Sequence, residues 1–257
     1  MRLDRLLVER GLARSRAQAQ ALIRDGVVRV DGAEVRRPAE TIAASAHVTA
    51  PLDPYVSRAA HKLIGALDDL ELRVAGRALD AGSSTGGFTQ VLLERGCDPV
   101  HAVDVGTDQL APGLRADPRV VVHERTNLRD LRLDHLGARV DLTVADVSFI
   151  SLTLVVGPLA AVTDPAGSML LMVKPQFEVG RERLGRGGVV RAADQHAEAV
   201  RAVAVAAAAS GWHAWAVCPS RLPGPAGNRE FFLLLRTPPA PVPLDVAAAV
   251  VAASLTG

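Results

Sequence analysis

Two lysines stand out among the positively charged residues of this chain. The sequence has 29 lysine and arginine residues, and all of them except Lys62 and Lys174 are arginine. Arginine keeps its proton near neutral pH, whereas a lysine side chain is a compact charge that an enzyme can tune for acid–base or electrostatic work. The two positions that retain lysine are therefore candidates for chemistry.

Acidic residues lie where they could pair with these lysines. Asp146 closes the short apolar run 141–146, and Lys174 directly follows the run 169–173. The carboxyl ends of neighbouring parallel strands meet at one edge of a sheet, so we expect an ion pair between the two, either catalytic or a plain salt bridge. Glu230 precedes the apolar run 231–235, and taken alone it would be interpreted as a solvated strand end.

A glycine-rich stretch has the pattern of a short apolar run, a tight turn and a helix start, which predicts a ligand site. Its sequence is Leu79-Asp80-Ala81-Gly82-Ser83-Ser84-Thr85-Gly86-Gly87-Phe88. Such a turn presents unpaired backbone N–H groups at the carboxyl edge of a sheet, where α/β proteins bind ligands. The same edge would carry Asp146 and Lys174.

Three interpretations of the glycine-rich stretch compete. A dinucleotide fingerprint is weakened because Ser84 stands where a second glycine should admit a pyrophosphate. A nucleophile elbow, Gly82-Ser83-Ser84-Thr85-Gly86, would make Ser84 the nucleophile of a serine hydrolase. Such an elbow normally follows earlier strands of the sheet, whereas this one would follow the first strand of its domain. The candidate histidines, His196 and His213, lie in no convincing loop after a strand. Asp80 favours the third interpretation, a loop that wraps the amino-acid end of S-adenosylmethionine (SAM).

Two further residues suggest a nucleoside ligand. Asp104 ends the strand that follows the glycine-rich stretch, where a carboxylate can accept hydrogen bonds from a ribose diol. NAD, SAM and other adenosine ligands all satisfy this arrangement, and Asp104 could instead cap the next turn. Asn127, after the third strand, is a candidate for an adenine contact.

The elements that must position these residues alternate between strands and helices. The apolar runs are short, β-branched or aliphatic and nearly continuous, which is typical of a parallel sheet covered on both faces. We predict an α/β, Rossmann-like sheet with helices on both faces. The predicted strands are 78–80, 99–104, 120–123, 141–146, 169–173, 213–218 and 231–235, and the predicted helices include 57–70, 192–210 and 244–255.

The first fifty residues have a different organisation. Apolar residues at helical spacing predict two short helices, the second capped by Ser15 and ended by Gly26. Asp31-Gly32 between two β-branched runs predicts a hairpin with a type I′ turn. We therefore expect a small α+β domain at 1–50, a proline-containing linker at 51–56 and the larger domain at 57–257.

Charge separates the same two parts of the chain. Residues 1–50 contain nine arginines and six acidic residues, while the whole chain has a net charge of only +1. An arginine-rich face can track RNA phosphates, although a solvated surface explains the same composition. The candidate phosphate-binding residues are Arg10, Arg14, Arg16 and Arg24.

The composition of the chain also bears on where in the cell the protein is expected. The two cysteines, Cys97 and Cys218, predict neither a disulfide framework nor a metal cluster, and we expect no bound metal. The N-terminus opens directly into a charged amphipathic pattern, and the most apolar tract, 202–209, is too short to span a bilayer. We expect a cytoplasmic protein with no membrane association and no obligate protein partner.

The candidate residues together resemble a known family. Lys62, Asp146, Lys174 and Glu230 follow the K-D-K-E order of the FtsJ-like ribose 2′-O-methyltransferases. Together with the stretches 55–58, 82–89, 145–152, 174–180 and 227–232, the chain closely resembles the TlyA family, also called haemolysin A, nearly end to end. Residues 12–19 and 28–32 resemble the small RNA-binding fold named after ribosomal protein S-four.

This resemblance implies a function and a set of roles. Members of the family transfer a methyl group from SAM to the ribose 2′-hydroxyl of cytidine in 23S rRNA, and some also in 16S rRNA. It implies that the tetrad is catalytic, that rRNA within ribosomal subunits is the partner, and that the N-terminal domain holds RNA through its backbone and shape. The cofactor-binding residues expected from it are Asp80, Gly82, Ser83, Ser84, Thr85, Gly86, Gly87, Phe88, Asp104, Asn127 and Asp146.

Two alternatives stay open at this point. One is the serine hydrolase that uses Ser84. The other is a protein without catalysis, either an RNA-binding protein with a degenerate enzyme domain or a haemolysin, as the second family name suggests. Charge attraction by Asp146 would keep Lys174 protonated, so the residue types do not decide between a general base and a fixed positive charge at the reacting oxygen.

Overall fold

The structure is a computed structural model of the 257-residue chain. It describes all residues except 14, 52, 186, 225, 241–243 and 256–257. Contacts between Cα atoms divide the chain into two compact units, Met1–Pro54 and Tyr55–Gly257. The N-terminal unit has one buried hydrophobic cluster and the C-terminal unit has two, and no cluster is shared, so each unit is described by itself.

The N-terminal unit consists of two helices and a small antiparallel sheet of order β2-β1-β3. Ser15 Oγ accepts a hydrogen bond from the backbone N–H of Gln18, which confirms the predicted cap. Asp31 and Gly32 both have positive φ (50° and 84°), as the predicted type I′ turn requires. The elements are α1 (Leu3–Glu9), α2 (Arg16–Arg24), β1 (Arg29–Val30), β2 (Ala33–Glu34) and β3 (Val48–Thr49).

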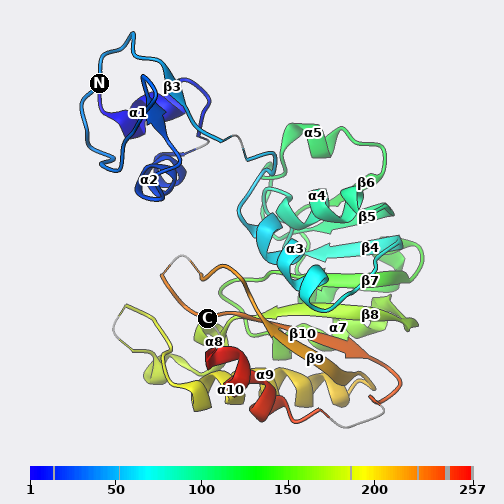
Figure 1. Ribbon diagram of the computed structural model, residues 1–257. Helices are drawn as coiled ribbons and strands as arrows, with labels where there is room; N and C mark the ends of the chain where they lie inside the picture. Colours follow the sequence, from blue (N-terminus) through cyan, green and yellow to red (C-terminus); the bar gives the residue numbers. More distant parts are fainter. Residues whose placement is uncertain (14, 52, 186, 225, 241–243, 256–257) are drawn as a thin grey trace. The chain divides into compact units, whose positions relative to one another are not determined.

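The C-terminal unit is built on a seven-stranded sheet of order β6-β5-β4-β7-β8-β10-β9 (Figure 1). The five strands from β4 to β8 are parallel, and β10 is antiparallel to both of its neighbours. The strands are β4 (Gly76–Ala81), β5 (Cys97–Val103), β6 (Val120–His123), β7 (Val140–Ala145), β8 (Thr163–Val173), β9 (His213–Pro219) and β10 (Phe231–Arg236).

Helices and short helical turns connect these strands. The α-helices are α3 (Ala59–Asp69), α4 (Gly87–Glu94), α5 (Pro112–Arg115), α6 (Leu133–Leu136), α7 (Val156–Val162), α8 (Pro175–Glu178), α9 (Ala193–Ala208) and α10 (Val246–Leu255). The 3₁₀ turns are η1 (Leu128–Asp130), η2 (Leu152–Leu154) and η3 (Arg181–Arg183). No helix of the described residues is long and apolar enough to cross a membrane.

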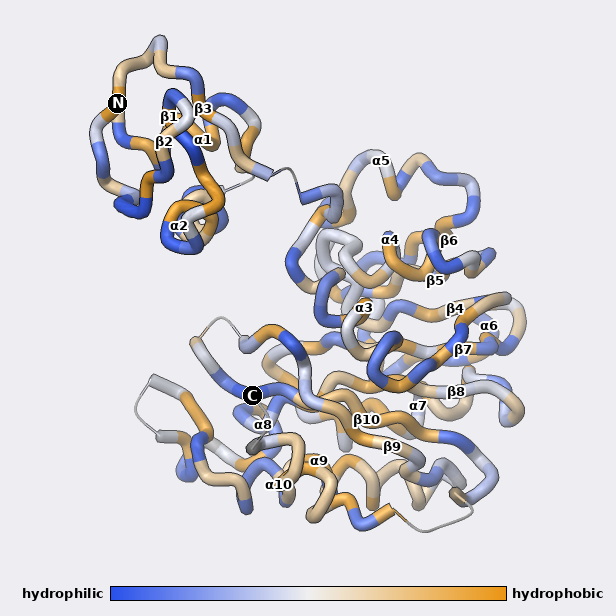
Figure 2. The backbone as a smooth tube through the Cα atoms, viewed as in Figure 1, coloured by the Kyte–Doolittle hydropathy of each residue, from blue (hydrophilic) through white to orange (hydrophobic). Residues whose placement is uncertain are grey.

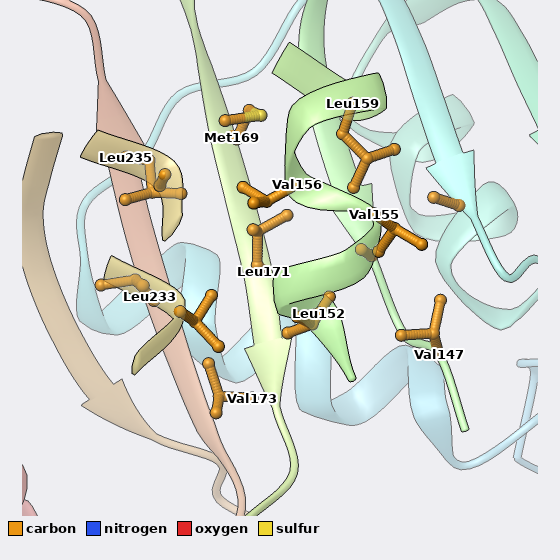
Figure 3. Packing of buried hydrophobic residues seen from close by; sticks show 14 of the residues in the cluster. Val147, Leu152, Val155, Val156, Leu159, Met169, Leu171, Val173, Leu233 and Leu235 are labelled. Atoms are coloured by element: carbon orange, nitrogen blue, oxygen red, sulfur yellow. The ribbon is translucent and has the colours of Figure 1, made fainter. Parts of the chain in front are cut away.

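Both faces of the sheet are covered, as the apolar runs predict. On one face α3 and α4 pack against the strands, and on the other face α6, α7, α9 and α10 do so. Alternate residues of β8 serve the two faces: Met169, Leu171 and Val173 lie in one cluster, which Figure 3 shows beside α7 and β10, and Leu170 and Met172 lie in the other. In Figure 2 the tube through α9, α10 and β10 is mainly tan to orange, the hydrophobic end of the scale.

Most element bounds differ from the predicted ones by one or two residues, and the start of β8 differs by more. Strand β8 begins at Thr163, six residues before the apolar run at 169, because its irregular first part pairs with Val140 across a register shift in β7. Pairing through the backbone does not need apolar side chains, so no apolar pattern in the sequence indicates this part of the strand. Helix α3 begins at Ala59, while Ser57 Oγ accepts a hydrogen bond from the N–H of Ala59 at its start.

Candidate active site

The turn between β4 and α4 lies at the carboxyl edge of the parallel strands. Gly82 has φ +87°, and a Cβ atom there would lie 2.6 Å from the backbone oxygen of Asp146, so this position requires glycine. The N–H of Ser84 donates to Asp104 Oδ2 (2.8 Å), and the N–H of Asp146 donates to the backbone oxygen of Ala81 (3.0 Å). These bonds join the ends of β4, β5 and β7 into one fixed edge.

Two cavities adjoin at this edge, with volumes of about 270 and 490 Å³. Both are lined by Gly82, Ser84, Asp146 and Ser148, so they meet beside the turn. The smaller cavity is lined by Ser57, Arg58, Ala59, Lys62, Asp80, Gly82, Ser83, Ser84, Thr85, Gly87, Phe88, Asp146, Ser148, Lys174 and Glu230. The larger is lined by Gly82, Ser84, Asp104, Val105, Gln109, Thr126, Asn127, Leu128, Asp146, Val147, Ser148, Phe149 and Ile150.

The predicted cofactor residues therefore divide between two adjoining spaces. Asp104 and Asn127 line the larger cavity, while Asp80 and most of the glycine-rich turn line the smaller one. Gly86 lines neither; it has φ +96° at the start of α4, and a Cβ there would collide with Leu110 and Leu114. Its contribution is to the backbone of the turn.

Asp80 is a fully buried carboxyl group at the wall of the smaller cavity. Its Oδ2 accepts a hydrogen bond from Thr89 Oγ1 (2.7 Å), and its Oδ1 has no hydrogen-bond partner among the described residues. Burial raises the pKa of Asp80 to about 7, and the nearby carboxylates of Asp146 and Asp104 act in the same direction. An unpaired buried acceptor of this kind suits a cationic ligand group.

The two lysines form two ion pairs in the same cavity. Lys174 Nζ lies 2.6 Å from Asp146 Oδ1, at the edge where the strand pattern predicts the pair. Lys62 Nζ lies 2.5 Å from Glu230 Oε2, although the two residues are far apart in the sequence. Glu230 is only 1% exposed, so the alternative of a solvated strand end is wrong.

The hydrolase alternative lacks its general base. Ser84 has φ +47°, and its Oγ donates to Gln109 Oε1 (3.2 Å). No histidine is among the described residues that line the two cavities. A serine nucleophile needs an adjacent base within hydrogen-bond reach, and the described part of this site provides no histidine for that role.

Comparisons with known proteins decide the family. Residues 55–237 match the model of the FtsJ-like methyltransferases, and residues 1–48 match the S4 domain. The chain belongs to the FtsJ-like methyltransferase family. It is a methyltransferase with an S4 domain at its N-terminus, and the cofactor of the family is SAM.

Several relatives of this methyltransferase are known. The 16S/23S rRNA (cytidine-2'-O)-methyltransferase TlyA of Mycobacterium tuberculosis is 52% identical over 240 residues, which are 92% of this chain and 90% of the relative. Hemolysin A of Brachyspira hyodysenteriae is 37% identical, over 74% of this chain and 81% of the relative. A solved structure from Streptococcus thermophilus that carries the name hemolysin is 35% identical, with a TM-score of 0.77, and covers 98% of this chain and 95% of that one.

The residues of the FtsJ-like site fit SAM. The unpaired Oδ1 of Asp80 can accept a hydrogen bond from an ammonium group such as that of SAM, and the carboxylate oxygens of Asp104 have lone pairs that a ribose diol could use. The larger cavity combines apolar walls from Val105 and Ile150 with the amide of Asn127, as an adenine ring requires. Gly82 and Ser84 of the glycine-rich turn line both cavities.

The N-terminal arginines have neighbours within their own unit. Arg10 donates to the backbone oxygens of Ala46 (2.7 Å) and Ala44 (2.5 Å), and Arg16 donates to the buried carboxylate of Asp4 (3.0 Å). Arg24 donates to Gln20 Oε1 at 3.3 Å. Arg14 lies outside the described residues. Arg10 and Arg16 thus support the fold of this unit, and a role for any of the four in RNA binding stays a prediction.

Two residues without a predicted role lie at the site. Ser148 Oγ accepts a hydrogen bond from Lys174 Nζ (2.8 Å). Glu178 accepts hydrogen bonds from Ser151 Oγ (2.5 Å) and the N–H of Leu152 (2.9 Å), and so ties the turn after β7 to α8. Both lie within segments that resemble the TlyA family, but nothing in their residue types alone shows which atoms they reach.

Proposed function

We propose that this methyltransferase modifies the ribose 2′-hydroxyl of cytidine in 23S rRNA, and in 16S rRNA as a second substrate. The observation that carries the proposal is the pair of buried ion pairs, Lys62–Glu230 and Lys174–Asp146, in the cavity that also holds Asp80. A relative that is 52% identical carries the name of this activity. The S4 domain supports RNA as the partner.

The reaction sets a clear task for the protein. SAM supplies a methyl group activated by its positively charged sulfur. A ribose hydroxyl is a weak nucleophile, so the protein must position its oxygen and stabilise negative charge on it as the proton leaves.

We assign this electrostatic role to Lys174. Lys174 is 8% exposed and its ammonium is paired with Asp146, so it offers a positive charge in a space with little competing water. The ammonium has three N–H groups, so the one that does not face Asp146 or Ser148 is available to the ribose oxygen. The proton of the hydroxyl is released to solvent.

Lys62 and Glu230 have a positioning role in this proposal. They are 4% and 1% exposed and are joined by a hydrogen bond of 2.5 Å, so their polar atoms hold one arrangement. A rigid pair at the cavity wall can hold the hydroxyls of a ribose in the orientation that methyl transfer requires. We further propose that the substrate is rRNA within ribosomal subunits, which places the protein in the cytoplasm.

The test is methylation of defined RNA substrates. The protein is incubated with labelled SAM and with separated ribosomal subunits or naked rRNA, and the modified nucleotide is mapped by mass spectrometry. We expect one modified cytidine in 23S rRNA and a second in 16S rRNA. Labelling of Ser84 by a serine-reactive phosphonate, or lysis of red cells by SAM-free protein, without rRNA methylation, would contradict the proposal.

A further inference from the structure

The two lysines of the site are held in different ways. Lys62 Nζ makes its ion pair and its hydrogen bond with the same atom, Glu230 Oε2. Lys174 Nζ divides these interactions between two residues. Its charge partner is Asp146 Oδ1 at 2.6 Å, but that oxygen receives no bond of hydrogen-bond geometry, and the aligned hydrogen bond of the ammonium goes to Ser148 Oγ at 2.8 Å.

A charge at 2.6 Å holds the ammonium in place but does not by itself fix its rotation, because Coulomb attraction has little angular preference compared with a hydrogen bond. From this division of labour we infer that Ser148 is a positioning residue that sets the direction of the Lys174 N–H groups toward the ribose oxygen. This inference rests on the proposed function in one respect, namely that the ribose oxygen of the substrate is what the N–H groups of Lys174 face.

The turn that carries Ser148 is fixed at both ends. At its start, the N–H of Asp146 donates to Ala81 in β4, and at its end, Ser151 and the N–H of Leu152 donate to Glu178 in α8. Lys174 immediately precedes α8. The acceptor oxygen of Ser148 and the donor nitrogen of Lys174 are therefore carried by segments that are bound to each other.

A hydroxyl suits this position better than a second carboxylate. It accepts a hydrogen bond from an ammonium and donates one to a neutral amine, so the contact persists in either protonation state of Lys174. It also adds no negative charge to a cavity wall that already has Asp80, Asp146 and Glu230. The other charged groups that line this cavity are Lys62 and Arg58.

The exposed position of Ser148 allows a clean test. Ser148 is exposed, so Ser148→Ala removes a hydroxyl without opening a cavity, and Ser148→Thr retains the hydroxyl. Ser168→Ala is a matched control, since it removes a serine hydroxyl in β8 that bonds Arg236 outside the site. Turnover and KM with rRNA, the affinity for SAM and thermal stability are measured for all four proteins.

We expect Ser148→Ala to lower kcat by about 10- to 100-fold, which corresponds to loss of one hydrogen bond to a charged group. KM for rRNA, SAM affinity and stability should stay within about twofold or a degree or two of the wild type. Ser148→Thr should recover most of the turnover, and Ser168→Ala should be unaffected. Wild-type turnover by Ser148→Ala, or a loss of SAM affinity that accounts for its slower rate, would overturn the inference.

A spectroscopic measurement tests the role of Ser148 without an assay of methyl transfer. Because the chain has only two lysines, protein labelled with ¹⁵N-lysine and carrying no tag gives two side-chain ammonium signals. Lys62→Arg assigns them. We expect Ser148→Ala to accelerate the exchange of the Lys174 ammonium with water several-fold while Lys62 is unchanged. An unchanged Lys174 signal would overturn the inference even if turnover fell, whereas an inactive wild type would contradict only the proposed function.

Discussion

At the scale of single residues, the site contains charged side chains that are buried and paired with each other. Lys62, Lys174 and Glu230 are each less than a tenth exposed, and a buried charge is costly unless it is paired. Each of these charges has its partner within 2.6 Å. Asp80 is the exception, because one of its oxygens has no partner among the described residues.

Replacement of Asp80 by asparagine should raise stability in a pH-dependent way. Burial raises the pKa of Asp80 from 3.8 to about 7. The folded state then holds a proton that the unfolded state has released, so the stability from this group is greatest below pH 4 and is lost as the pH rises to 7. We expect Asp80→Asn to be more stable than the wild type by about 2 to 4 kcal/mol at pH 8 and nearly equal at pH 4.

Urea unfolding of both proteins without cofactor at pH 4 and pH 8 measures this difference. Asp80→Asn should also bind SAM more weakly, because it replaces an acceptor that can carry full negative charge. An equal stability difference at the two pH values would show that Asp80 does not change its protonation on folding.

Replacement of Lys174 by arginine should separate charge from geometry. A guanidinium keeps the positive charge but is larger and planar, and it cannot occupy the point that a compact ammonium holds between Asp146 and Ser148. We expect methyl transfer to fall by about 100-fold or more, with SAM affinity within about twofold of the wild type. Near-normal turnover would rule out the proposed role of Lys174.

At the scale of elements, Glu178 joins the turn after β7 to α8, which are the two segments that follow the ends of neighbouring parallel strands. Its side chain accepts hydrogen bonds from Ser151 Oγ and the N–H of Leu152. Burial raises the pKa of Glu178 above its usual value, in keeping with an enclosed position. These hydrogen bonds hold the turn that contains Asp146 and the segment that contains Lys174 in a fixed position relative to each other.

Glu178→Ala should therefore affect both stability and catalysis. It leaves the N–H of Leu152 without its partner, which costs about 1 to 3 kcal/mol of unfolding free energy. Turnover should fall as the turn loosens, and Glu178→Gln should recover part of both effects because its amide oxygen can accept one bond. Denaturant unfolding and methylation assays check this prediction, and an alanine variant as stable as the wild type would contradict it.

The elements themselves are largely predictable from sequence, because each strand of the sheet contains a short apolar run. Strand β6 has the predicted bounds, and the Asp146–Lys174 pair follows from adjacent parallel strand ends. The partner of Lys62 does not follow. Whether Glu230 is solvated or buried depends on how α3 and the start of β10 come together, and that is a tertiary contact between distant segments.

Several contacts made by turns and loops also cannot be predicted from the sequence. The early start of β8 at Thr163 comes from pairing with β7 that needs no apolar side chain. The bonds of Arg10 to the backbone oxygens of Ala44 and Ala46 require the folded loop before β3. The hydrogen bond of Ser148 to Lys174 depends on a turn in which Phe149 takes φ +65°. A residue pattern specifies the elements far better than it specifies such turns.

At the scale of the whole molecule, the chain divides its tasks between two units with separate cores. Both cavities lie within residues 55–257, and the match to the S4 domain covers residues 1–48. The N-terminal fifty residues have three more arginines than acidic residues, whereas the chain as a whole has a net charge of +1. Cofactor chemistry and RNA affinity are therefore expected to be separable.

A fragment of residues 55–257 should bind SAM with the affinity of the full chain, because all of the cavity-lining residues belong to it. Its methylation of rRNA should fall by about tenfold or more at physiological salt and recover partly at low salt, where the remaining phosphate contacts strengthen. Calorimetry measures the affinity for SAM, and filter binding measures the affinity for rRNA, of the fragment and of the full chain. Equal rRNA affinity for the fragment and the full chain would contradict this division.

The most direct test of the central claim is the chemical position of the transferred methyl group. A 2′-O-methyl group blocks alkaline cleavage of the adjacent phosphodiester, whereas methylation of a base does not. After reaction with labelled SAM, rRNA is hydrolysed in alkali and the labelled product is separated by size. The Lys174-centred mechanism predicts label in an alkali-resistant dinucleotide that begins with cytidine, and its loss with Lys174→Arg. Label in a mononucleotide, or undiminished label with Lys174→Arg, would contradict it.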